Sequence, residues 1–243
     1  MRIQIINPNT CQGMTDKIAQ SAQSVALPTS DILARSPAHG PESIESAFDE
    51  AIAGAAVLDV IADGEQQGVD AHIIACFGDP SIDAAREIAH APVIGIAGAA
   101  FQLASLVAHR FGVVTTMSRT LPAAHHLLDR YGYAHLCSGV RATDIPVLDL
   151  EHVEHSIYQQ LLDECRAAIE QDGAEAIVLG CAGMSDLANE LSLELQVPVI
   201  DGVAAAVKLA ESLHQLKLTT SKSGQYAAPL SKAFIGRYAH LSR

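Results

Sequence analysis

The chain contains an internal repeat in which each half carries one cysteine at the same place. Residues 68–78 (GVDAHIIACFG) align with residues 173–183 (GAEAIVLGCAG), so Cys76 corresponds to Cys181, and the two copies lie 105 residues apart, from 76 to 181. In both copies a short apolar run typical of a buried strand leads directly to the cysteine. The repeat therefore predicts two similar units, each ending a strand in a thiol.

The repeat continues on both sides of the cysteines. Residues 2–7 align with 110–115, and residues 92–94 align with 198–200, in the same order and at nearly the same separation. Each match is weak alone, because apolar runs recur in any α/β chain. Together they indicate two related α/β lobes, joined near residues 96–100.

Short apolar runs alternate with helical patterns along the chain, which is the signature of βαβ units and a parallel sheet. We predict strands at 3–6, 32–35, 71–75, 93–96, 111–114, 139–142, 176–179 and 199–200, and helices that include 44–62, 82–89, 155–170 and 187–195. A helix from 203 to about 213 and a polar tail follow. The predicted fold class is α/β, with two pseudosymmetric lobes (1–97 plus 203–243, and 98–202), each a mainly parallel sheet flanked by helices, and an active site in the cleft between them.

Charge and composition exclude several partners. The 243 residues are 49% hydrophobic and 18% charged, which describes a compact folded protein. A net charge of −13 disfavours nucleic acid and anionic membranes, since both need clustered cations. No signal-peptide pattern or apolar run of membrane-spanning length occurs, so we expect a cytoplasmic protein.

The five cysteines do not suggest a disulfide framework or a zinc site. Their number is odd, none form Cys-x-x-Cys, and no second pair at ligand spacing accompanies His135 and Cys137. Glycine-rich dinucleotide and Walker motifs are also missing from the sequence. We therefore predict no metal and no cofactor, and any chemistry must come from side chains.

Ligands of parallel α/β sheets bind beyond the carboxyl ends of the strands, where Cys76 and Cys181 fall. A helix follows each cysteine, and its free N–H groups should favour a thiolate. We interpret Asp79 as the N-cap of the first helix and Ser185 as a cap for the second. A single cysteine often only fills core space. Two at equivalent strand ends favour a pair in which one thiolate removes a proton from a carbon acid and the other thiol returns one to the opposite face.

Other strand-end residues have both a structural and a functional interpretation. Asn7 and Asn9 either form a turn or orient a substrate. Thr115 and Thr116 hold the equivalent position in the second lobe. His39 and Ser43 lie in the loop that enters the helix at 44. They either reach the cleft or serve only as loop and helix-cap residues.

At these residues the chain resembles the aspartate/glutamate racemase superfamily and, within it, the hydantoin/allantoin racemases. The matching segments are 6–10 (INPNT), 40–45 (GPESIE), 76–80 (CFGDP), 180–184 (GCAGM) and 197–202 (VPVIDG). The resemblance covers nearly the whole chain. The resemblance implies a cofactor-independent racemase. It also implies that Cys76 and Cys181 lie on either side of the substrate stereocentre.

The resemblance also narrows the substrate. Amino acid racemases of the superfamily carry Asp-Ser-Gly near the first strand and Thr-His after the second cysteine, where this chain has Asn7-Pro8-Asn9 and Ala182-Gly183. This difference favours a 5-substituted hydantoin, with allantoin in purine degradation as the first choice and other hydantoins, amino acids or a related carbon-acid reaction as alternatives. A non-catalytic binding module is the alternative from another class.

From this likeness we expect the substrate to be held by strand-end and loop residues of both lobes, in a homo-oligomeric protein. The expected contacts are Asn9, Ser43, Phe77, Gly78, Thr115, Thr116, Ala182, Gly183 and Met184.

Overall fold

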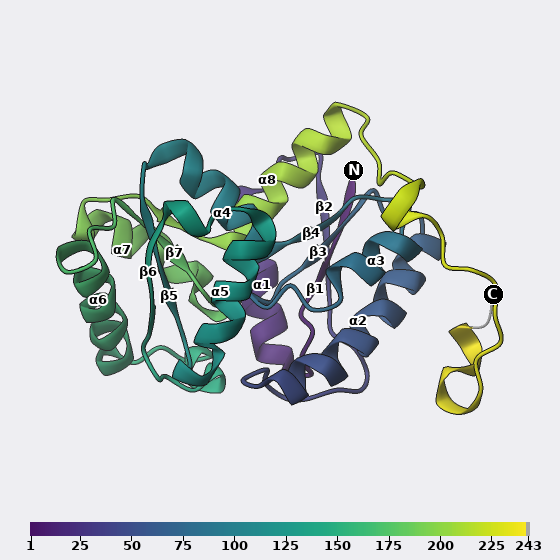
Figure 1. Cartoon of the computed structure of the whole chain (residues 1–243), viewed down its shortest axis with the longest axis horizontal. Helices are drawn as coiled ribbons and strands as arrows, with labels where there is room; N and C mark the ends of the chain where they lie inside the picture. Colours follow the sequence, from purple (N-terminus) through teal and green to yellow (C-terminus); the bar gives the residue numbers. More distant parts are fainter. Residues whose placement is uncertain (242–243) are drawn as a thin grey trace.

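The computed structural model describes residues 1–241, without the side chains at 237, 240 and 241, and its eight strands form two parallel sheets of four (Figure 1). All eight lie where the hydrophobic runs predict them. The strands are β1 (Arg2–Ile6), β2 (Asp31–Arg35), β3 (Ala71–Ile74), β4 (Val93–Gly95), β5 (Phe111–Thr115), β6 (Cys137–Ala142), β7 (Ala176–Leu179) and β8 (Val199–Ile200).

The two sheets repeat one another in strand order and in register. The orders are β2-β1-β3-β4 and β6-β5-β7-β8. Ile3 of β1 is paired with Ala71 of β3, and the equivalent Phe111 of β5 is paired with Ala176 of β7. The alignment of the two halves in the sequence is therefore a structural equivalence, and the predicted two-lobed α/β fold class is confirmed.

Helices cover the outer face of each sheet and fill the space between the sheets. In Figure 1, α2 and α3 lie outside the first sheet and α6 and α7 outside the second, whereas α4 and α8 lie between them. The predicted helix at 44–62 instead begins at Ala47, because the Ser46 hydroxyl accepts a hydrogen bond from the Asp49 N–H as its N-cap. The helices are α1 (Gln12–Val25), α2 (Ala47–Gln66), α3 (Ile82–Ile88), α4 (Ile96–Val107), α5 (Leu121–Tyr131), α6 (His155–Glu170), α7 (Ala188–Leu195) and α8 (Gly202–Gln215).

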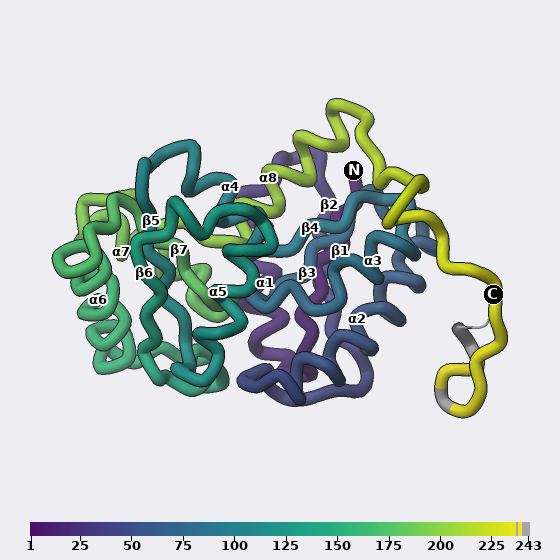
Figure 2. The backbone as a smooth tube through the Cα atoms, in the orientation of Figure 1, coloured from purple at the N-terminus to yellow at the C-terminus, as the bar shows by residue number. Residues whose placement is uncertain are grey.

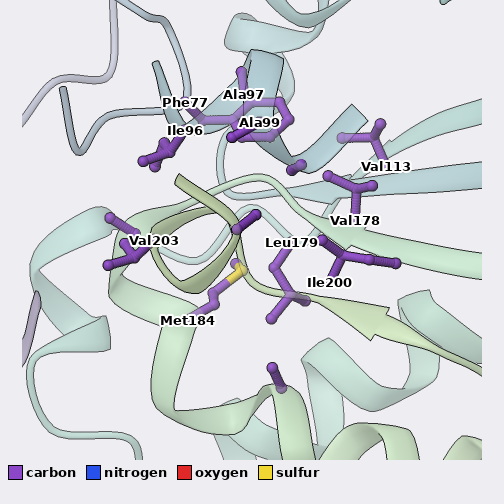
Figure 3. Close-up of a cluster of buried hydrophobic side chains, with 14 of the residues drawn as sticks. Phe77, Ile96, Ala97, Ala99, Val113, Val178, Leu179, Met184, Ile200 and Val203 are labelled. Carbon is purple, nitrogen blue, oxygen red and sulfur yellow. The ribbon is translucent and has the colours of Figure 1, made fainter. Parts of the chain in front are cut away.

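The larger of two apolar clusters runs from one sheet to the other. Phe101 of α4 is completely buried, stacks on Phe111 of the second lobe at 5.7 Å and meets the edge of Phe77 of the first lobe at 5.6 Å. Figure 3 shows this region, with Phe77 above and Val178 and Leu179 of β7 below. Because α4 packs against strands of both sheets, the predicted lobe boundaries stay a prediction.

The segment after α8 crosses to the first lobe and runs along its edge (Figure 2). The Thr220 N–H donates to the His90 carbonyl at 3.1 Å, and the Lys222 ammonium donates to the Arg86 carbonyl at 2.6 Å. Tyr226 accepts a hydrogen bond from the Arg86 guanidinium at 3.2 Å. These contacts tie the tail to α3 and the loop after it.

Asp79 does not cap the helix that follows Cys76, so that prediction is wrong. Asp79 and Ser81 adopt left-handed backbone angles (φ 44° and 57°), which delay the start of α3 to Ile82. The Asp79 carboxylate turns instead to the start of α4, where it accepts hydrogen bonds from the N–H groups of Ala97 and Gly98 at 3.2 and 3.1 Å. The Tyr131 hydroxyl donates to the same carboxylate at 2.7 Å.

The second lobe caps its equivalent helix with a different residue. Asp201 accepts hydrogen bonds from the N–H groups of Val203 and Ala204, both at 2.9 Å, and so caps α8 from its own N-cap position. In the first lobe the matching N-cap position is Gly95, and a β-carbon there would lie 2.1 Å from Cγ of Asp79. The missing side chain leaves room for a carboxylate that arrives from another loop.

Asp79→Ala should lower the free energy of unfolding by about 2–4 kcal/mol, because two N–H groups and the Tyr131 hydroxyl lose their acceptor in the core. Gly95→Ala should also destabilise the protein, by displacing the carboxylate. Urea unfolding followed by circular dichroism measures both changes. Wild-type stability of both variants would contradict this role for Asp79.

Asp79 should also give stability a specific pH dependence. Burial raises the pKa of Asp79 to about 6, so the folded chain holds this proton more tightly than the unfolded chain does. The free energy of unfolding of the wild type, measured relative to Asp79→Asn, should therefore rise as the pH falls from about 7 to about 4. A flat difference across this range would contradict the assignment.

Candidate functional site

The carboxyl ends of β1, β3, β5 and β7 open into one cavity of about 330 Å³ between the lobes. Both Cys76 and Cys181 line it, and its wall is mainly apolar. The first lobe contributes Asn7, Pro8, Asn9, Met14, Ile18, Ile44, Ser46, Ala47, Glu50, Ala75, Cys76, Phe77 and Gly78, and the second Thr115, Thr116, Arg119, Thr120, Pro122, Ala123, Ala124, His126, Val147, Gly180, Cys181, Ala182 and Gly183. This is the size of pocket that a small ring fills.

The second thiol is fixed by tight packing of two strand ends. The Thr115 hydroxyl donates to the Gly180 carbonyl at 3.0 Å, and a β-carbon on Gly180 would lie 2.6 Å from that of Thr115. Only glycine lets β7 approach β5 so closely one residue before Cys181. The Cys181 sulfur then accepts a hydrogen bond from the Gly183 N–H at 3.4 Å and is itself the N-cap of the 3-10 helix η4 (Ala182–Leu187).

Ser185 is therefore not the cap that the sequence suggested. It lies inside η4, where its hydroxyl donates to the Ala182 carbonyl at 2.7 Å. The helix begins earlier than the polar residue predicts, because a cysteine sulfur occupies the capping position.

Both thiols are protonated at neutral pH. Burial raises the pKa of Cys76 to about 12 and that of Cys181 to about 11, although a backbone N–H, from Gly78 and Gly183 respectively, acts in the opposite direction. The N–H groups after each cysteine thus favour the thiolate as expected, but desolvation is the larger effect and raises both pKa values. The charge of a Cys181 thiolate would also raise the pKa of Cys76, so the two sulfurs interact electrostatically.

The surroundings of the two thiols are not symmetric. Lys17 lowers the pKa of Cys181, and Glu45 acts in the opposite direction as the smaller effect. The Lys17 ammonium is held by the Leu150 carbonyl at 2.7 Å and by Asp186 at 3.0 Å. Negative charge on Glu50 instead raises the pKa of Cys76. Of the two sulfurs, Cys181 is therefore the more readily ionised.

Polar groups from the loops that follow β1 and β5 face the same cavity. Asn9 is buried, and its Oδ1 accepts hydrogen bonds from Asn7 Nδ2 at 2.7 Å and from the Cys11 N–H at 2.9 Å. Its own Nδ2 has no protein partner in residues 1–241. The Thr116 hydroxyl likewise lines the cavity without a partner among the described side chains. Both groups are free to donate to a ligand oxygen.

Seven of the nine predicted substrate contacts line the cavity, and two do not. Ser43 lies three residues before the Ser46 cap, so the chain presents Ile44, Ser46 and Ala47 in its place. Met184 is completely buried and points among the core side chains of β7 and α8 in Figure 3, because η4 turns it away from the cavity. His39 lies in a separate surface groove.

Sequence reasoning missed the helix residues that complete the wall. Glu50 stands in the first turn of α2, and Pro122 and Ala123 stand in the first turn of α5. Val147 belongs to the 3-10 helix η3 (Val147–Leu150), whose first N–H donates to Glu45 of the other lobe at 2.8 Å. The sequence indicates that a helix follows β2 and that another follows β5. Which residues of these helices face the cavity depends on how each helix is rotated about its axis, and packing sets that rotation.

Among the described residues no three His, Cys, Asp or Glu side chains gather closely enough to hold a metal ion. None of the helices in the described residues has the length and apolar character needed to cross a membrane.

The chain is similar in sequence to known proteins. Residues 3–210 match the model of the Asp/Glu/Hydantoin racemase family. The chain is 48% identical over 236 residues to the hydantoin racemase of Rhizobium meliloti, covering 97% of this chain and 98% of that protein. It is 44% identical over 243 residues to the hydantoin racemase of Pseudomonas sp. strain NS671, covering 100% and 98%.

A solved structure agrees with these sequence matches. The allantoin racemase from Klebsiella pneumoniae superposes with a TM-score of 0.97 at 51% identity, covering 100% of this chain and 99% of that chain. These likenesses confirm the predicted resemblance and the predicted enzyme class, a racemase. The chain belongs to the Asp/Glu/Hydantoin racemase family.

Proposed function

We propose that this protein interconverts the enantiomers of a 5-substituted hydantoin, with allantoin as the first substrate to test, and that Cys76 and Cys181 are its two catalytic groups. The observation that carries the proposal is the placement of two thiols at equivalent strand ends of one cavity. The names of the relatives, hydantoin racemase and allantoin racemase, support the substrate class.

In the proposed reaction the ring lies between the two sulfurs. One sulfur, as thiolate, takes the C5 proton, and the electron pair moves onto the neighbouring carbonyl oxygen to give an enolate. The other thiol then gives its proton to the opposite face of C5, so the product is the mirror image and the two sulfurs have exchanged protonation states. Reversal of the same steps returns the first enantiomer, and no cofactor is required.

The surroundings fit this chemistry. A thiolate whose conjugate acid has a raised pKa is a stronger base toward a weakly acidic C–H, at the cost of a smaller thiolate population. Asn9 Nδ2 and the Thr116 hydroxyl supply donors for the oxygen on which charge develops. The apolar wall excludes water that would otherwise compete for these donors.

Allantoin is preferred over 5-alkyl hydantoins on the polar part of the wall. Ser46, Glu50, Arg119 and Thr120 line the cavity together with the apolar Ile44, and a ureido substituent needs polar partners. A role in purine degradation follows from this substrate. Other 5-substituted hydantoins remain the second choice, because two of the relatives are named for them.

The Cys76→Ser and Cys181→Ser variants should each lose racemisation of enantiopure allantoin by at least about 100-fold, since one of the two proton-transfer groups is gone. Each should still exchange the C5 proton of one enantiomer in deuterated water, and the preferred enantiomer should differ between them. Circular dichroism follows racemisation and NMR follows exchange. Wild-type racemisation by both variants would overturn the two-thiol mechanism.

Alkylation should show the difference between the two thiols. The pKa of Cys181 is about 11 and that of Cys76 about 12, so Cys181 should react faster with iodoacetamide at pH 9, and both rates should rise with pH. Peptide mass spectrometry reads each site, with the fully buried Cys165 as the internal control. Faster reaction at Cys76 would contradict the charge asymmetry.

Slow alkylation at neutral pH does not by itself indicate a non-catalytic binding module, because burial slows both thiols in an enzyme too. The deuterium exchange measurement separates these two functions, since a binding module leaves the C5 proton in place.

A further inference from the structure

Glu50 is the one acidic side chain on the cavity wall, within the described residues, and the proposed proton transfers do not use it. It lies in the first turn of α2, half-buried, with its Cδ 3.4 Å from the position of a β-carbon on Gly78. The carboxyl group therefore stands over the loop that carries Cys76, at the edge of the space where the ring would lie.

Nothing in residues 1–241 compensates the charge of this carboxyl group. Its oxygens accept no hydrogen bond from a described side chain or backbone N–H, and no ion pair reaches it. Burial accordingly raises its pKa. A ligand that fills the cavity would take these half-buried oxygens further from water, so the position calls for an N–H from the ligand.

The polar groups of the wall divide into donors and an acceptor. Asn9 Nδ2 and the Thr116 hydroxyl offer donors, as does the exposed guanidinium of Arg119, whereas Glu50 offers a charged acceptor. An uncharged cyclic amide presents both C=O and N–H groups at its edge, so it matches both kinds. The ring-opened form of the cyclic amide, like a free amino acid, presents a carboxylate. Glu50 would repel that carboxylate at close range in this low-dielectric cavity.

We propose that Glu50 is a specificity-determining residue that accepts an N–H of the cyclic ureide and excludes the ring-opened carboxylate from the same site. The inference rests on the proposed substrate class and extends it. A second consequence concerns Cys76: the charge on Glu50 favours its protonated form, which suits a thiol waiting to donate.

The test compares two achiral ligands, hydantoin and its ring-opened form hydantoic acid, in wild type and in Glu50→Gln. Neither ligand has a stereocentre, so turnover adds no net heat and titration calorimetry reports binding alone. Glu50→Gln should raise the dissociation constant of hydantoin by about 10- to 100-fold, because a hydrogen bond to a charged acceptor is lost. The same variant should bind hydantoic acid about tenfold more tightly, because repulsion is removed.

Opposite shifts for the two ligands separate specificity from damage to the fold. Asp63→Asn is the matched control, since Asp63 is an exposed acid on the same helix, and it should change both dissociation constants by less than about twofold. Unchanged constants in Glu50→Gln, or weaker binding of both ligands together, would overturn the role of Glu50.

The proposed function can fail separately. If wild type binds hydantoin with the predicted response to Glu50→Gln but neither racemises allantoin nor exchanges its C5 proton, then the acceptor role stands and the racemase activity does not. If allantoin is racemised and Glu50→Gln leaves KM and the hydantoic acid constant unchanged, then only the specificity inference fails.

Discussion

The site depends on the apolar contact between the two lobes, because each lobe supplies only one thiol. Phe101 on α4 touches Phe77 of one lobe and Phe111 of the other. Burial of three aromatic side chains in one cluster contributes several kcal/mol to the free energy of folding. Phe77 directly follows Cys76, so the same contact that joins the lobes also positions the first sulfur. In the proposed mechanism the ring is approached from two faces, which requires this kind of rigid separation of the sulfurs.

Polar contacts across the rim add direction to that apolar contact. Glu45 of the first lobe accepts the N–H of Val147 from the second lobe, and Lys17 of α1 reaches the Leu150 carbonyl and Asp186. Both charged groups act on Cys181: Lys17 lowers the pKa of its thiol and Glu45 raises it. Glu50 instead acts on Cys76, whose pKa it raises. The two halves are thus similar in backbone and different in electrostatics, which lets nearly symmetric strands support two chemically distinct sulfurs.

The sequence was sufficient for the fold, and for the site only in part. The equivalence of the two sheets follows from the repeat, because buried parallel strands are apolar runs that align residue by residue. The order of the strands within each sheet was not predicted and comes from the structure. Asn9 and Thr116 were found because strand ends are predictable. Glu50 was missed and Ser43 and Met184 were misplaced for one reason: which way a helix residue faces depends on where the helix starts and how it packs. Ser46 sets that start for α2, and Cys181 sets it for η4. Asp79 was assigned to the nearest helix, whereas its left-handed backbone sends it to a distant one.

The two ways of capping α4 and α8 have a consequence for how the halves of the repeat can change. In the first lobe the carboxylate is at position 79 and glycine at 95, whereas the matching second-lobe positions hold Met184 and Asp201. Conversion of one arrangement into the other requires two substitutions. If Gly95 is replaced first, the new side chain collides with the Asp79 carboxylate. If Asp79 is replaced first, the N–H groups at the buried start of α4 lose their acceptor. Both single-step intermediates are unfavourable, so the pair is epistatic. Since the once-equivalent halves are separated by this barrier, a swap of segments between them would fail unless both positions moved together.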